Sequence, residues 1–128
     1  MSEESPQPDV LQQSTLDQLL ALDDGAYGLL KEMHQLFLDD FQGRMDAIQR
    51  ALDTDNLEEL GEVAHAVKGA ASTMGANRVR AVAAALETSA RKGVTDTPHA
   101  ELFRHLKLNY QEALDALQAF ITKGLGKE

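Results

Sequence analysis

The residues best suited to chemistry in this chain of 128 residues lie in the segment VAHAVKGAASTMGA, residues 63–76. Its histidine, His65, has Gly61 four positions before it and Gly69 four positions after it. Residues four apart stack on one face of a helix, so these glycines would leave the helix surface bare on both sides of the imidazole. Each glycine costs a helix interior about 1 kcal/mol relative to alanine, so we expect the pair to have a functional reason.

Helical geometry predicts that His65 points away from the protein core. At about 100° per residue, Met74 lies opposite His65, and other apolar residues lie near Met74: Leu60, Val63, Val67, Ala70 and Ala71. The face of His65 carries residues that are not large and apolar: Gly61, Glu62, Lys68, Gly69 and Ser72. An accessible imidazole with small neighbours and an ammonium group nearby suits an atom that accepts and returns an anionic group such as phosphate.

Two simpler interpretations stay open at this point. A single histidine on a helix is usually a polar surface residue. Helical glycines can also serve close helix packing, although packing glycines belong on the inner face, and Gly61 and Gly69 are predicted on the outer one. Together, the glycine pair, the lysine and the outward direction favour the chemical interpretation.

The order of these residues is similar to a known signature. The stretch HAVKG, residues 65–69, is followed six residues later by the pair GA. It closely resembles the signature of the HPt (histidine phosphotransfer) family, an H-x-x-K-G core followed by a small G-A pair. The resemblance covers roughly residues 14–122 and implies a four-helix-bundle phosphocarrier.

The resemblance also implies a role for each residue of the motif. His65 would take a phosphoryl group on Nε2 from a receiver-domain aspartyl phosphate or a histidine kinase, a hybrid kinase included, and pass it to another response-regulator receiver domain. Lys68 would interact with the phosphate, and Gly69 would leave room for it. The small residues of the docking surface would be Gly61, Gly69 and Ser72. No cofactor is expected, because the magnesium ion would belong to the partner receiver domain.

A glutamate is expected to orient the histidine. Phosphotransfer domains of chemotaxis kinases carry one on the following helix, bonded to the histidine Nδ1, and that role falls here on Glu87. The position of Glu87 in its own helix also supports this role. Glu87 is next to Leu86, which is predicted to point inward, so it lies at the edge of the buried stripe of that helix, from where its carboxylate can reach the adjacent helix. Accepting a bond from Nδ1–H would leave Nε2 free. The alternative is a solvated surface glutamate. Arg91, one turn later, is a candidate second cation.

Helical periodicity predicts the elements that must position these residues. A short helix in STLDQLLALDDG ends at Gly25, and four longer ones cover about residues 26–52, 56–76, 77–92 and 98–122. Candidate signals for helix starts are Ser14 or Thr15, Asp55 or Asn56, Asn77, and Pro98 at a first helical position. The apolar stripe of the second helix is predicted to comprise Leu29, Leu30, Met33, Leu36, Phe37, Phe41, Met45, Ile48 and Leu52.

No run of alternating apolar residues predicts a strand. Amphipathic helices with short connections must bury their stripes on one another. The expected fold is therefore all-α, an up-down antiparallel four-helix bundle with the short first helix across one end. The expected domain covers residues 14–122, between a flexible N-terminal tail, 1–13, and a frayed C-terminal tail, 123–128.

Composition excludes several classes of function. A formal net charge of −9 argues against nucleic acid and anionic membranes as partners, and the absence of cysteine excludes disulfides and thiol chemistry. The polar, acidic N-terminus and the lack of a long apolar run predict a cytoplasmic protein. The other histidines, His34, His99 and His105, form no metal-ligand pattern, so no metal site is expected.

Two classes of function stay open. The chain has no Gly-rich phosphate loop, so it should not phosphorylate itself, and a phosphoryl-carrying signalling monomer is favoured. The alternative is a helical adaptor or dimerisation bundle that keeps the motif without using it. His65, Lys68 and Gly69 together favour the first, because an adaptor has no need of the glycines.

Overall fold

The computed structural model describes residues 10–93 and 97–126. This part of the chain forms five helices and no strand, which confirms the all-α class. The helices are α1 (Gln13–Leu22), α2 (Gly28–Asp53), α3 (Leu57–Met74), α4 (Asn77–Lys92) and α5 (His99–Leu125). Most of the predicted N-terminal tail and the end of the C-terminal one lie outside the described residues. Within them, Val10 and Leu11 pack against the core, and α5 extends to Leu125.

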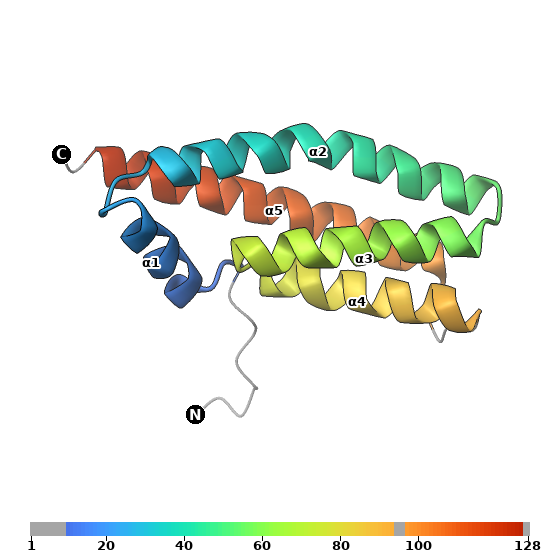
Figure 1. Cartoon of the computed structure of the whole chain (residues 1–128). Coiled ribbons are helices and arrows are strands. Elements are labelled where there is room, and N and C mark those ends of the chain that lie inside the picture. Colours follow the sequence, from blue (N-terminus) through green and yellow to red (C-terminus); the bar gives the residue numbers. More distant parts are fainter. Residues whose placement is uncertain (1–9, 94–96, 127–128) are drawn as a thin grey trace, which may run out of the picture.

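The four long helices lie lengthwise beside one another (Figure 1). Helix α2 contacts α3, α3 contacts α4, α4 contacts α5, and α5 contacts α2. Figure 1 shows the short α1 near the end where α2 begins and α3 finishes, and α1 contacts both of these helices. The pair α3 and α4 packs most extensively, which matters because the candidate residues come from these two helices.

The helix starts agree only partly with the sequence signals. Asn56 caps α3 as predicted, with its side chain accepting a bond from Glu59 N–H at 3.1 Å. The caps predicted for α1 and α4 are wrong. Gln12 precedes α1, and Asn77 is the first residue of α4, after Ala76; neither helix has a side-chain cap. Helix α4 lacks a side-chain cap because the turn that joins it to α3 is closed by backbone hydrogen bonds.

Gly75 makes this turn. Its φ of 73° is left-handed, which ends α3 immediately before α4 starts. The N–H of Ala76 donates to Ala71 O at 2.8 Å, and Gly75 O accepts a bond from Gln12 N–H at 2.8 Å. A Cβ on Gly75 would lie 2.8 Å from Thr15 Cβ. The glycine therefore fixes both the turn that aligns α3 with α4 and the docking of α1.

The core consists of the inward stripes of the helices, with one exception. The helical period assigns Leu36 to the α2 stripe, but its side chain is 58% exposed. It lies about 100° around the helix from that of Phe37, which is buried. The buried stripe of α2 therefore runs through Leu30, Phe37, Met45 and Ile48.

None of the helices in the described residues has the length and apolar character that crossing a membrane requires.

Candidate functional site

The contact between α3 and α4 brings together two candidate residues that are 22 positions apart in sequence. The Nδ1 atom of His65 on α3 lies 2.9 Å from Oε2 of Glu87 on α4. The side chain of His65 is 64% exposed, whereas that of Glu87 is 11% exposed. An accessible imidazole is therefore hydrogen-bonded to a buried carboxylate.

Glu87 is held by two cations as well. The ammonium of Lys68 lies 2.7 Å from Oε1, the oxygen that the histidine does not use. The guanidinium of Arg91 contacts Oε2 through Nη2 at 3.0 Å and through Nε at 3.1 Å. A buried carboxylate is stable only when its charge is compensated, and these donors provide the compensation.

The same contacts decide the protonation of the pair. The hydrogen bond from Lys68, with further bonds from Arg91 and His65, lowers the pKa of Glu87 to about 2, although burial alone would raise it. Glu87 is therefore ionised at neutral pH and can only accept hydrogen bonds. The Nδ1 atom of His65 must then carry the hydrogen, and the lone pair of the neutral ring lies on Nε2.

Gly69 and Ser72 lie on the exposed side of α3. A Cβ on Gly69 would meet nothing within 4 Å, so the surface beside the histidine is open there. Ser72 is exposed as well, and its hydroxyl donates to the backbone oxygen of Lys68 at 3.1 Å. Both residues therefore lie on the surface that a partner approaching along α3 would meet.

Gly61 does not lie on that surface, contrary to the prediction. It is buried, and a Cβ at this position would lie 3.5 Å from Cγ of Arg91 and 3.7 Å from Cβ of Ala90. The helical wheel describes an isolated helix and predicts the same face for residues four apart. Here α4 packs against the flank of α3 that carries Gly61, and the stem of Arg91 covers it.

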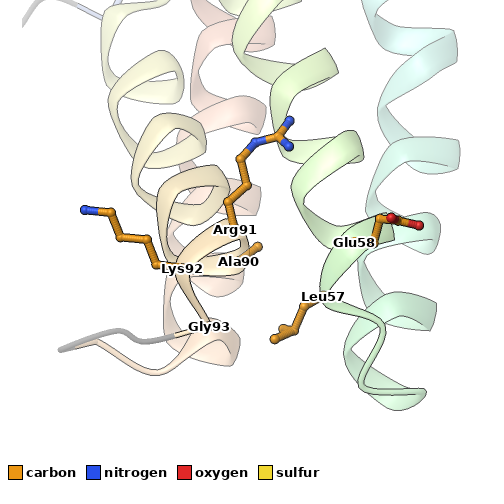
Figure 2. Close-up of a pocket in the computed structure, with 6 residues that line it drawn as sticks. All are labelled: Leu57, Glu58, Ala90, Arg91, Lys92 and Gly93. Atoms are coloured by element: carbon orange, nitrogen blue, oxygen red, sulfur yellow. The ribbon is translucent and has the colours of Figure 1, made fainter.

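A hollow lies between the start of α3 and the end of α4, with a volume of about 480 Å³. It is lined by Leu57 and Glu58 of α3 and by Ala90, Arg91, Lys92 and Gly93 at the end of α4 (Figure 2). Figure 2 shows the side chain of Arg91 extending from α4 toward α3, whereas Lys92 points away from α3. Arg91 therefore both lines this hollow and contacts the carboxylate of Glu87.

No three potential ligands among His, Asp and Glu side chains of the described residues come together to hold a metal ion. His34 lies on α2, and His99 and His105 lie on α5, so none of them belongs to the two helices that carry His65 and Glu87. The titratable groups that meet at the site are one imidazole, one carboxylate and two cations.

Comparison with known proteins identifies the family. The sequence model of the Hpt domain family matches residues 32–120, more than half of the chain. The chain belongs to the Hpt domain family. Hpt domains are phosphocarrier modules that act in histidine phosphotransfer within phosphorelays, where they interact with receiver domains and kinases, and this is the function of the present Hpt domain.

A solved structure shares the fold of this Hpt domain. It is the histidine-containing phosphotransfer protein B (HptB) from Pseudomonas aeruginosa PAO1, with a TM-score of 0.79 and 22% sequence identity. The similarity covers 91% of this chain and 98% of the other one. A comparison with curated protein sequences gives no significant match.

The sequence does not predict how the cations of the Hpt domain are arranged. The motif leads us to expect Lys68 to interact with a bound phosphate, and in the structure its ammonium contacts Glu87. Arg91 is only an additional cation in the sequence, yet it contacts the same carboxylate oxygen as the histidine. The spacing of Glu87 and Arg91, four residues apart on one helix, is the available signal for their ion pair.

Proposed function

We propose that His65 is the phosphorylated residue of this Hpt domain and that Nε2 is the reacting atom. The observation that carries the proposal is the exposed ring whose Nδ1 lies 2.9 Å from a buried, ionised carboxylate. Because Nδ1 donates to Glu87, the lone pair for a nucleophilic attack lies on Nε2.

In the proposed step the Nε2 lone pair forms a bond to the phosphorus of a receiver-domain aspartyl phosphate. The bond between phosphorus and the aspartyl oxygen breaks, and the aspartate leaves as a carboxylate with the electron pair. The ring then carries the phosphoryl group on Nε2 and its hydrogen on Nδ1, so it gains positive charge. Glu87 compensates that charge, because an adjacent carboxylate favours a cationic imidazole. Transfer to another receiver domain is the reverse of this step.

Lys68 and Gly69 have supporting roles in the proposal. The lysine stem is flexible, so its ammonium can leave Oε1 of Glu87 and pair with the phosphoryl oxygens. Gly69 lies in open surroundings and leaves space for the partner. Ser72 is also a docking-surface residue in this proposal, whereas Gly61 is not.

The proposal also covers the arrangement of the helices, the cellular location and the partners of this Hpt domain. We propose an up-down antiparallel four-helix bundle of α2 to α5 with α1 across one end, supported by the short connections and by the cyclic order of helix contacts. We further propose a cytoplasmic monomer without kinase activity or a cofactor of its own. Its proposed partners include a hybrid histidine kinase, and magnesium would be bound by the receiver domain.

The experiment is phosphoryl transfer from purified, phosphorylated receiver domains, followed as acid-labile phosphate on the chain. His65→Gln should abolish labelling without a change in helicity, because the side chain is exposed. His105→Gln is the matched control, since this histidine is also exposed, and it should be labelled like the wild type. Substantial labelling of the His65→Gln variant would overturn the assignment. A wild type that no receiver domain labels would contradict the proposed transfer from an aspartyl phosphate to His65.

A further inference from the structure

Arg91 contacts the candidate site through Glu87 and not through the reacting ring. Its Nη2 and Nε atoms lie 3.0 and 3.1 Å from Oε2 of Glu87, the oxygen that also faces Nδ1 of His65. The guanidinium side chain is 56% exposed, but its stem lies over α3 at Gly61. Two donor atoms on one oxygen restrict the carboxylate more than a single donor does.

The two cations differ in the oxygen that they contact. Lys68 bonds Oε1, whereas Arg91 bonds Oε2. The proposed reaction requires Lys68 to leave Glu87 for the phosphoryl group. The carboxylate would then lose one of its two compensating cations at the moment when it must hold the ring. Arg91 can stay in place, because both of its donor atoms contact Oε2, the oxygen that faces the ring.

We propose that Arg91 is a positioning residue for phosphotransfer, which keeps Glu87 aligned with Nδ1 of His65 when Lys68 moves to the phosphoryl group. The inference rests on the proposed function of His65 and deepens it. Gly61 lies beneath the stem of Arg91, since a Cβ there would be in van der Waals contact with Arg91 Cγ at 3.5 Å. The spacing of Gly61 predicts cleared space for a partner, whereas in the structure α4 occupies that side of α3.

The burial of the pair supports this assignment. Glu87 is the one charged residue that is buried among the described residues, so it depends on its counter-ions more than a surface glutamate does. Lys92, the next residue, is exposed and points away from α3, so it cannot replace Arg91 (Figure 2). Compensation of the Glu87 charge therefore depends on a cation at position 91, and a cation at position 92 of the same helical turn does not provide it.

The test compares Arg91→Gln with the matched control Lys92→Gln, which removes the same charge one position away. The first readout needs no phosphoryl donor: ¹⁵N NMR of the His65 ring measures the fraction of the neutral ring that carries its hydrogen on Nδ1. We expect Arg91→Gln to lower that fraction and Lys92→Gln to leave it unchanged. The second readout is the rate of transfer from a phosphorylated receiver domain, which should fall about tenfold in Arg91→Gln only.

A double variant tests whether Lys68 and Arg91 act on different groups during transfer. If Lys68 pairs with the phosphoryl group while Arg91 holds Glu87, the two cations act on different groups, and Lys68→Gln combined with Arg91→Gln should slow transfer by the product of the two single effects. A double variant no slower than the slower single variant, or an unchanged tautomer and rate in Arg91→Gln while His65→Gln abolishes labelling, would overturn the positioning role. A wild type without labelling would instead contradict the proposed function, and the tautomer measurement would still decide whether Arg91 orients the pair.

Discussion

Nδ1 of His65 and Oε2 of Glu87 lie 2.9 Å apart, although the two residues belong to different helices and differ greatly in exposure. The carboxylate is ionised and buried, so it holds the exposed ring in one orientation and selects one tautomer. The lone pair of the neutral ring therefore lies on Nε2 before a partner arrives. An exposed histidine without such a contact would rotate and exchange its hydrogen between both nitrogens.

Removal of the Glu87 carboxylate should slow phosphotransfer. We expect Glu87→Ala to reduce the transfer rate about 10- to 100-fold, the usual effect of losing a residue that orients a reacting imidazole. Glu87→Gln should be affected less, because its amide oxygen can still accept the bond from Nδ1–H. Rates measured with one phosphorylated receiver domain check both variants. Equal rates in Glu87→Ala and the wild type would show that the contact does not assist the reaction.

The pKa of Glu87 predicts how stability depends on pH. Its value in the folded protein is about 2, below the ordinary value of 4.5, so the unfolded state takes up the proton first as the pH falls. The stabilisation is complete above pH 4.5 and is lost as the pH falls toward 2. Over that range the wild type should lose on the order of 2 kcal/mol more of its free energy of unfolding than Glu87→Gln. Urea unfolding of both proteins at several pH values measures the difference, and parallel curves would contradict it.

A large side chain at position 69 should slow transfer without harming the fold. Gly69 is exposed, and a Cβ at this position would have no neighbour within 4 Å, so Gly69→Leu should leave stability level or raise it by up to about 1 kcal/mol. The new side chain occupies the surface beside the ring, and displacement of reacting atoms by about 1 Å can cost about 100-fold in rate. We therefore expect transfer to slow about tenfold or more.

The matched control for that variant is Gly43→Leu. Gly43 is also exposed and also has open surroundings, but it lies on α2. It should show the same gain in stability and a normal transfer rate. If Gly69→Leu also transferred normally, the open surface at that position would have no role in docking.

Alanine at position 75 should destabilise the protein. Gly75 has a φ of 73°, and a Cβ there would lie 2.8 Å from Thr15 Cβ, so strain and a clash add together. We expect Gly75→Ala to lower the free energy of unfolding by about 2 kcal/mol or more. Gly93→Ala is the control, because Gly93 has a φ of 71° but only Leu57 at 4.0 Å, and it should cost about 1 kcal/mol. Equal losses in chemical denaturation would show that the contact with Thr15 adds nothing.

The sequence by itself determined the helices, the motif and the exposure of the histidine. Their signals are local: an apolar period of 3.6 residues, Gly93 after the last turn of α4, and the spacing around His65. The direction of His65 followed from the opposite position of Met74, which is buried. The all-helical class followed from the same periodicity. These features depend on residues within a few turns of one another, so one sequence suffices to predict them.

Only the tertiary structure decided which groups meet at the site. Gly61 and Gly69 are equally spaced from His65, but α4 covers the first and leaves the second open. The sharing of Glu87 by Lys68 and Arg91 likewise depends on how closely α3 and α4 pack and on their relative rotation. The physical reason is that the helical period places a side chain on a face, whereas its partners are set by the neighbouring helix, whose position no local spacing encodes.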